Sequence, residues 1–230
     1  MLTPYYQQNA EFVTITREQG SQFAKKVADD FNPLHDADAK KFCVPGDLLF
    51  SLVLSRYGVS ENMYFKFEGM VDETSQLQFP EAADEFAVTS NEKVMLSVKR
   101  DGETSQCPTL IESLTKNYVA FSGTTFPHMI VPVMGEKEVM INPARPMVIY
   151  ESMAIHFDDI NVKSVELETD TPEFEYEGKR GNIILKFNFM SEGKKVGRGE
   201  KHMLVSGIKA YDQQAIDDLI AYYNERKATL

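Results

Sequence analysis

The stretch that decides the fold is residues 45–57, which read PGDLLFSLVLSRY. Its apolar side chains occupy more than one face of a helix, and a helix that is apolar on most sides has to be buried. Gly58 follows directly, and glycine is the usual residue just beyond a helix end. The stretch therefore predicts a buried central helix around which the chain is organised.

Shorter elements are expected on both sides of this helix. Thr16 as a cap and apolar residues at helical spacing predict a first helix over residues 17–30, which Asn32-Pro33 would end. Downstream, runs rich in β-branched and aromatic residues predict strands at residues 63–70, 85–90, 94–99 and 110–121. The composition of residues 100–102, Arg-Asp-Gly, predicts a hairpin turn between two of these strands.

The second half of the chain is expected to repeat this order of elements. Residues 144–157, ARPMVIYESMAIHF, predict a second apolar helix. Strands are predicted at residues 162–168, 182–190 and 199–208, and a surface helix at residues 211–226. The segments that begin at Val94 and Ile183 each read as strand, acidic-glycine turn, strand and Ser-Gly, which indicates two diverged copies of one unit.

An apolar helix followed by antiparallel strands has one simple burial solution, in which the sheet wraps around the helix. Two such units side by side would fuse their sheets and cover edge strands. The predicted fold class is therefore α+β, a double hotdog: two repeats of a long central helix wrapped by an antiparallel sheet, plus a C-terminal helix. The N-terminal repeat is assigned to residues 1–125, and the C-terminal repeat with the terminal helix to residues 126–230.

Charge and composition narrow the classes of partner and site. With a net charge of −11 over 230 residues and a pI near 4.9, the chain lacks the positive field that binding to nucleic acid or an anionic membrane needs. Cys43, Cys107 and the four histidines show no metal-ligand spacing, so no metal site and free thiols are expected. The N-terminus lacks the features of a secretory signal, and no apolar run approaches the roughly 20 residues of a membrane span, so a cytoplasmic location is expected.

The hexapeptide Asp30-Phe31-Asn32-Pro33-Leu34-His35 directly follows the first predicted helix. It resembles the D-x-N-P-x-H motif of the MaoC-like (R)-specific enoyl-CoA hydratases, the hydratase 2 family of the hotdog superfamily, at all four defined positions. Residues 46–52 are similar to the stretch that opens the central helix of that family. The resemblance is close over residues 23–55 and covers most of the chain as an order of elements.

This resemblance implies reversible hydration of trans-2-enoyl thioesters. The reaction needs a base that takes a proton from water, an acid that delivers one to Cα, and donors for the enolate oxygen. Asp30 and His35 would be the acid-base pair, the Asn32 amide would support them, and the N–H of Gly46 would hold the thioester oxygen. The substrate-contacting positions expected beside these are Pro33, Asp47, Leu48 and Ser51.

The implied substrate is an acyl-CoA or an acyl-carrier thioester, with CoA or phosphopantetheine present only as part of the substrate and no other cofactor. A homodimer is possible. The chain departs from the family in the loop before the central helix: about ten residues separate His35 from Gly46, and Pro45 stands where the family usually has histidine. Two other functions therefore stay open, a noncatalytic acyl-thioester sensor or scaffold and an acyl-CoA thioesterase. A purely structural interpretation also exists, in which Asn-Pro ends a helix and His35 satisfies a loop carbonyl.

Three further groups of residues are expected to have structural roles. The stretch Ser122 to His128, SGTTFPH, is expected to form the turn between the repeats. His156 is expected to be a core or interface histidine in the second apolar helix. A basic cluster is expected to lie on a solvated hairpin and consists of Lys194, Lys195, Arg198 and Lys201. The alternative is that it binds the phosphates of CoA.

Overall fold

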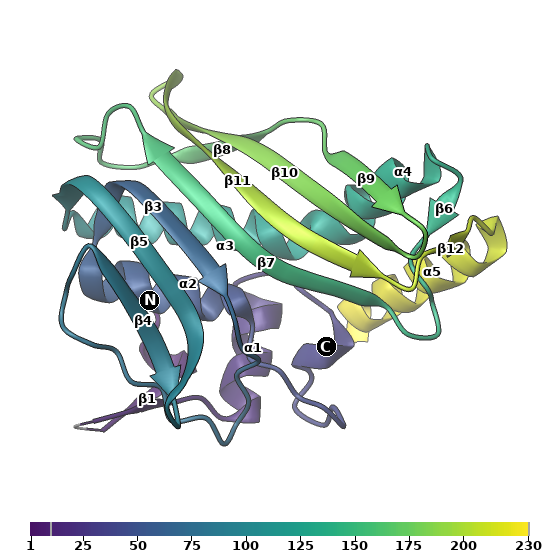
Figure 1. Ribbon diagram of the computed structural model, residues 1–230, viewed down its shortest axis with the longest axis horizontal. Coiled ribbons are helices and arrows are strands. Elements are labelled where there is room, and N and C mark those ends of the chain that lie inside the picture. Colours follow the sequence, from purple (N-terminus) through teal and green to yellow (C-terminus); the bar gives the residue numbers. More distant parts are fainter. Residues whose placement is uncertain (10, 230) are drawn as a thin grey trace.

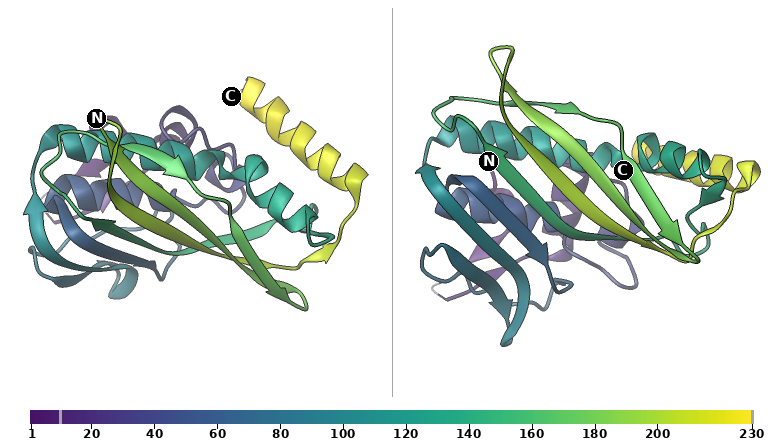
Figure 2. Two further views of the ribbon diagram at one scale, coloured as in Figure 1. Left: turned by 90° about the horizontal axis from the view of Figure 1, so that it is seen from above. Right: turned by 45° about the horizontal axis from the view of Figure 1, so that its top comes forward.

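The computed structural model describes residues 1–9 and 11–229, and its fold is α+β and hotdog-like. Two long helices, α2 and α3, pack on one side of an antiparallel sheet, and a C-terminal helix lies beyond them (Figure 1). Figure 2 shows from above that both helices cover the same face of the sheet. None of the helices in the described part of the chain is long and apolar enough to cross a membrane.

The helices are η1 (Thr3–Tyr5), α1 (Arg17–Lys26), η2 (Pro33–His35), α2 (Gly46–Tyr57), α3 (Pro108–His128), α4 (Ile130–Gly135) and α5 (Gln213–Thr229). The strands are β1 (Gln7–Gln8), β2 (Val13–Thr14), β3 (Val59–Phe67), β4 (Glu85–Ser90), β5 (Lys93–Ser105), β6 (Val139–Met140), β7 (Met147–Phe157), β8 (Glu166–Thr169), β9 (Glu173–Glu177), β10 (Arg180–Ser191), β11 (Lys194–Ser206) and β12 (Lys209–Ala210).

The main sheet has the order β4-β5-β3-β7-β11-β10-β8, and β9 also pairs with β10. Every pairing in it is antiparallel. Strands from the two halves of the chain meet at β3 and β7, where Met63 lies opposite Ile155. The sheet is therefore continuous across the middle of the sequence.

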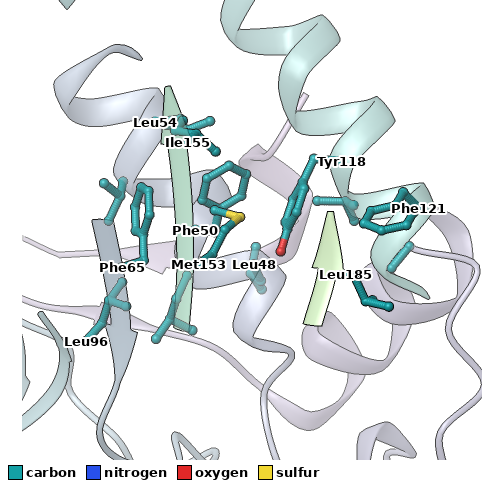
Figure 3. Packing of buried hydrophobic residues seen from close by; sticks show 14 of the residues in the cluster. Leu48, Phe50, Leu54, Phe65, Leu96, Tyr118, Phe121, Met153, Ile155 and Leu185 are labelled. Atoms are coloured by element: carbon teal, nitrogen blue, oxygen red, sulfur yellow. The ribbon is translucent and has the colours of Figure 1, made fainter. Parts of the chain in front are cut away.

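The core lies between this sheet and the two helices. The Phe50 ring of α2 contacts Phe65 of β3 and Tyr118 of α3, with ring centroids 5.1 and 4.8 Å apart (Figure 3). All three side chains are fully buried. Burying one such ring contributes about 1.5–3 kcal/mol, so these contacts fix how α2 sits against β3 and α3.

Several sequence predictions are confirmed. Residues 45–57 form the buried helix α2, which ends before Gly58, and residues 85–90 form β4. Thr16 caps α1 in a reciprocal capping box with Gln19. The strands expected at residues 182–190 and 199–208 lie in or overlap β10 and β11, and the C-terminal helix is α5. The first helix is shorter than predicted, however, because it ends at Lys26 and leaves Asp30 in the following loop.

Residues 110–121, predicted as a strand, form the middle of helix α3 instead. Leu110, Leu114, Tyr118 and Phe121 are buried, and their spacing of four, four and three residues is that of one helix face. Pro108 stands at the first turn of this helix, where a missing N–H costs nothing. The strand prediction was wrong, because the β-branched residues Ile111, Thr115 and Val119 also recur every four residues, which is helical spacing.

Residues 144–157, predicted as a helix, contain strand β7 instead. Met153, Ile155 and Phe157 are buried toward the helices, while the residues between them face the other side. β7 lies in the middle of the sheet, between β3 and β11, and Ala154, which stands between the buried Met153 and Ile155, is apolar too, so the alternation expected of an antiparallel strand is weak in the sequence. Such a stretch cannot be told from a buried helix by apolar content alone.

The predicted hairpin at residues 100–102 is wrong as well, because these residues lie inside the continuous strand β5. The β4–β5 turn is at Asn91 and Glu92, which both have positive φ. The proposed correspondence between the segments from Val94 and Ile183 also fails, since the first continues into a helix and the second into a strand. The division into residues 1–125 and 126–230 falls inside α3, at the one residue with non-helical φ and ψ, Phe126, and stays a prediction.

Candidate active site

The D-x-N-P-x-H segment folds into a tight turn that brings its two ends together. Asp30 Oδ1 accepts the N–H of Asn32 at 2.8 Å, and Asn32 Oδ1 accepts the N–H of Leu34 at 3.1 Å. Asn32 thereby caps the short helix η2. As a result, His35 Nε2 lies 3.6 Å from Asp30 Oδ2.

The orientation of the His35 ring is set by its other nitrogen. His35 Nδ1 lies 2.7 Å from the carbonyl oxygen of Cys43, which can only accept a hydrogen bond. A proton on Nδ1 leaves Nε2 of the neutral ring with a free lone pair that faces Asp30. The side chains of His35 and Asp30 are 13% and 23% exposed, so a small molecule from solvent can reach both.

The C-terminal helix α5 holds the loop that carries this pair. The Tyr223 hydroxyl donates to the carbonyl of Asp29, and Arg226 Nε donates to the carbonyl of Phe31, both at 3.3 Å. The guanidinium of Arg226 also pairs with the buried carboxylate of Asp36. The loop is therefore fixed by the last helix of the chain.

A second polar group lies at the start of α2. Asp47, in the first turn of this helix, is only 6% exposed. Its Oδ2 accepts a hydrogen bond of 2.5 Å from the Ser122 hydroxyl of α3, and Nζ of Lys201, which projects from β11, donates to the same hydroxyl. Lys201 is 4% exposed, so Asp47, Ser122 and Lys201 form a buried chain that joins a carboxylate to an ammonium through one hydroxyl.

Aromatic residues close one side of this chain. Lys201 Nζ lies 3.9 Å from the centroid of the Tyr150 ring, a cation–π contact, and the Tyr150 hydroxyl is hydrogen-bonded to that of Tyr118. The rings of Phe67 and Tyr150 pack with centroids 4.2 Å apart. A Cβ atom on Gly46 would lie 3.0 Å from Phe67 and 3.3 Å from Tyr150, so the first residue of α2 contacts this aromatic wall closely.

The charges of Asp30 and His35, here called the loop pair, influence the pKa values of the buried chain Asp47–Ser122–Lys201. Burial raises the pKa of Asp47, while the charge of Lys201 and the hydrogen bond from Ser122 oppose that rise. The negative charge of Asp30 raises the pKa of Asp47 further, and His35 lowers it. Burial lowers the pKa of Lys201, against the influence of Asp47 and Asp30. The loop pair and the buried chain therefore lie within one electrostatic environment.

Close backbone packing explains why α3, which carries Ser122, lies next to the loop that carries Asp30. A Cβ atom on Gly123 would overlap the carbonyl oxygen of Ala28 and lie 3.1 Å from the N of Asp30. Only glycine lets α3 approach the loop so closely. This contact places Ser122, the preceding residue of α3, beside the segment that carries Asp30.

The structure brings together some of the residues that the sequence singled out and separates others. Asp30 and His35 are adjacent, and Gly46 and Asp47 begin α2 in the same cluster. Leu48 and Ser51 are completely buried, and Ser51 Oγ donates to the carbonyl of Asp47. Pro33 is exposed on η2.

Ser122 was expected in a turn and Lys201 in a basic cluster on a hairpin, and neither Tyr118 nor Tyr150 was predicted as a site residue. The expected turn at residues 122–128 is instead the end of α3. Lys201 is not on a solvated hairpin with Lys194, Lys195 and Arg198, because it points into the core from β11, in phase with Met203 and Val205. That phase is a signal the sequence contains, since every second residue of a strand faces the same side.

The outer face of the sheet has a separate hollow of about 770 Å³, lined by residues such as Lys99, His156, Lys186 and Arg198. His156 was expected in an apolar helix but lies on β7, where its ring contacts Asn62 and Asp158. These side chains alternate with the buried ones along each strand, so the hollow is on the opposite face from Asp47. Within residues 1–9 and 11–229, no three His, Cys, Asp or Glu side chains are arranged to hold a metal ion.

Comparison with protein families identifies one that matches residues 1–214, described as "Protein of unknown function (DUF3581)". The chain belongs to this family. The match ends near the start of α5, so it contains both the loop pair and the buried chain. None of the curated proteins matches the sequence.

Two solved structures illustrate what the chain is similar to. A conserved protein of unknown function with a hot dog fold from Alicyclobacillus acidocaldarius is 8% identical, with 92% of this chain and 98% of that one covered and a TM-score of 0.47. An acyl-CoA thioesterase II, TesB2, from Mycobacterium marinum is 10% identical, with 73% and 91% covered and a TM-score of 0.40. At these TM-scores, neither likeness carries a conclusion about the activity of this chain.

Proposed function

We propose that the protein acts on acyl thioesters and adds water to trans-2-enoyl thioesters, with Asp30 and His35 as its acid-base pair. The observation that carries the proposal is the 3.6 Å separation between His35 Nε2 and Asp30 Oδ2 in a partly exposed loop. Nδ1 of His35 is held by the carbonyl of Cys43, three residues before α2 begins, which ties the pair to the start of the buried helix. The resemblance to the MaoC-like motif supports the same chemistry.

The proposed reaction uses water as its only co-reactant. A water molecule between the two side chains donates one hydrogen bond to His35 Nε2 and another to Asp30 Oδ2. Its oxygen bonds to Cβ while one of its protons passes to the pair, and the pair returns a proton to Cα. Positioned acid-base groups of this kind contribute about 100- to 10,000-fold to a rate.

The thioester oxygen needs hydrogen-bond donors while negative charge develops on it. Gly46 is the first residue of α2 and is partly exposed. The first N–H groups of a helix have no partner within the helix, and the helix dipole is positive there. Gly46 is therefore the proposed donor to the thioester oxygen.

We also infer that the chain is a double hotdog whose second repeat differs in detail from the sequence prediction. In the first unit, α2 precedes β3, β4 and β5; in the second, α3 precedes β7, β8, β10 and β11. Each unit thus has one long helix followed by antiparallel strands of the common sheet. The helix of the second repeat is α3 in this interpretation.

The test is hydration of crotonyl-CoA by the purified full-length chain, followed as loss of the conjugated enoyl absorbance with free thiol measured in parallel. Absorbance loss without thiol release is expected. Asp30→Asn and His35→Asn should each lower the rate by about 100-fold or more. Asp38→Asn, an exposed acid between η2 and α2, is the matched control and should retain the rate.

A lack of turnover over several acyl chain lengths, with folded protein, would contradict the hydratase proposal. If acyl-CoA still raised the unfolding temperature, a noncatalytic sensor or scaffold would be the better description, because a ligand that binds only the folded state stabilises it.

A further inference from the structure

We propose that Ser122 is a nucleophile that accepts the acyl group of a thioester, which gives the protein a thioester-hydrolysing activity besides hydration. The inference rests on the proposed function only for its substrate class, the acyl thioester. Ser122 is partly exposed on α3, and its hydroxyl lies between a carboxylate and an ammonium. A serine hydroxyl becomes reactive when a neighbouring group takes its proton and another stabilises its charge.

Asp47 is placed to be the base. The Ser122 hydroxyl donates to Asp47 Oδ2 at 2.5 Å, so the proton already points at its acceptor. A carboxylate that burial holds out of water is a stronger base than an ordinary one. Asp47 Oδ1 is buried and has no hydrogen-bond partner among the described residues, although buried oxygens of folded proteins nearly always have one. This oxygen can accept a hydrogen bond from the water that reacts in the second step.

Lys201 is placed to stabilise the negative charge on the serine oxygen. Its ammonium donates to the same Ser122 Oγ that donates to Asp47, and the Tyr150 ring lies against the ammonium. An ammonium this deeply buried is costly unless it is paired, and the hydroxyl is its link to the carboxylate of Asp47. The Ser122 hydroxyl thus links the charges of Asp47 and Lys201. Both charges also activate its oxygen.

The start of α2 lies next to the serine because Asp47 is in the first turn of that helix. The N–H of Gly46 can donate to the thioester oxygen when a tetrahedral intermediate forms on Ser122. α2 has 12 residues, so its aligned peptide dipoles place positive potential at this end. Nucleophile, base, cation and oxyanion donor therefore come from α3, α2 and β11 at one place.

The proposed reaction has two steps. In the first, Asp47 takes the proton of Ser122, Oγ bonds to the thioester carbon, the C–S bond breaks, and the leaving thiolate takes the proton from Asp47. In the second, water bonds to the same carbon, the C–Oγ bond breaks, and Ser122 regains a proton. The net reaction converts a thioester and water into a carboxylic acid and a thiol.

Hexanoyl-CoA, which has no double bond to hydrate, separates this activity from hydration. The full-length protein is mixed with it, quenched in acid, and measured by intact-mass and peptide mass spectrometry together with thiol release. A hexanoyl ester on the Ser122 peptide and released thiol are expected. Ser122→Ala should abolish the ester and lower thiol release by about 100-fold or more. Ser122→Cys should carry the acyl group as a thioester that hydroxylamine removes.

Thr124→Ala, two residues further along α3, is the matched control, because the Thr124 hydroxyl donates only to backbone carbonyls of its own helix. Asp30→Asn should block crotonyl-CoA hydration and still give the hexanoyl ester on Ser122, at a lower rate, because the charge of Asp30 raises the pKa of the base Asp47. If folded wild-type protein gave neither ester nor thiol, Ser122 would be a structural link between two charges and the inference would be overturned, whatever the result of the hydration assay.

Discussion

Arg226, in the last turn of α5, donates from Nε to the carbonyl oxygen of Phe31 across 3.3 Å. Phe31 directly follows Asp30, so a residue near the end of the chain fixes the backbone of the loop pair. The same guanidinium pairs with Asp36, just beyond His35. The two ends of the motif are thereby held by one side chain.

Replacing Arg226 should loosen this loop. Arg226→Ala removes one of the two cations that pair with the buried Asp36 and leaves Lys25, 2.9 Å away, as the other. A hydrogen bond to a charged group contributes about 1.5–3 kcal/mol, so a loss of that order is expected. We expect a lower unfolding midpoint in urea and faster hydrogen exchange confined to residues 28–36. Glu225→Gln, an exposed neighbour on α5, is the control. If hydrogen exchange of residues 28–36 were unchanged in Arg226→Ala, Arg226 would not hold this loop.

Gly123 should tolerate no larger residue. In Gly123→Ala the new methyl group would overlap the carbonyl oxygen of Ala28, so α3 or the loop must move. Overpacking of this kind costs about 1–3 kcal/mol, although alanine is the better helix former. The measurement is the free energy of unfolding in urea, compared with Thr124→Ala on the same helix. Stabilisation of Gly123→Ala would show that the two backbones are further apart than described.

Asp47 and Lys201 should prove strongly dependent on each other. Lys201→Met leaves the Asp47 carboxylate buried without its cation and should cost about 3–5 kcal/mol. The double variant Asp47→Asn/Lys201→Met removes both charges and should regain part of that loss, with a coupling free energy of about 0.5–3 kcal/mol. Urea unfolding of the four proteins in the cycle measures it, and additive losses would contradict the pairing.

The buried pair also predicts a pH dependence. Because the pKa of Asp47 is raised above 3.8 in the folded protein, the folded state retains a proton that the unfolded state has released just above that pH. Stability from this group therefore falls as pH rises through that window. The pKa of Lys201 is lowered from 10.5, so stability from that group rises with pH just below 10.5. In Asp47→Asn, the fall above pH 3.8 should disappear; a fall equal to that of the wild type would contradict the assignment.

The two cysteines should differ in reactivity. Burial, together with the charge of Asp72, raises the pKa of Cys43 to about 11, so roughly 0.1% of it is thiolate at pH 8. The pKa of Cys107 is lowered, chiefly by its hydrogen bond with the Thr109 hydroxyl. Iodoacetamide at pH 8 should therefore alkylate Cys107 first and Cys43 only after urea is added, as read by peptide mass spectrometry. Equal labelling of the native protein would refute this order.

The parts of the fold that were predictable from the sequence are those with a strong local signal. Helix α2 has a continuous apolar composition and a terminal glycine, and the proximity of Asp30 and His35 follows from the rigid Asn-Pro turn between them. Both features are determined within a dozen residues. The prediction of the loop pair therefore needed no knowledge of the rest of the chain.

The second half of the chain was harder to predict, because the sequence patterns of its elements depend on where each element lies in the fold. In β7 the apolar Ala154 stands between the buried Met153 and Ile155 and hides the strand period, and α3 meets the loop through the backbone at Gly123. Because residues 110–121 were predicted as a strand, Ser122 was expected in a turn. Lys201 was expected on a solvated hairpin because three other basic residues lie near it in the sequence. The buried chain joins residues that are 75 and 79 positions apart, a separation that local patterns do not report.

The pairing of β3 with β7 has a consequence for how the chain acquires its structure. Asn62 lies opposite His156, so this junction closes only after both halves of the polypeptide are present. Either half alone would end in a long strand with a row of unpaired N–H and C=O groups, a surface that recruits other strands. Contacts between residues so distant in sequence also slow folding. During synthesis, β3 is therefore an edge strand until β7 has been made, and an unpaired edge can pair with strands of other chains.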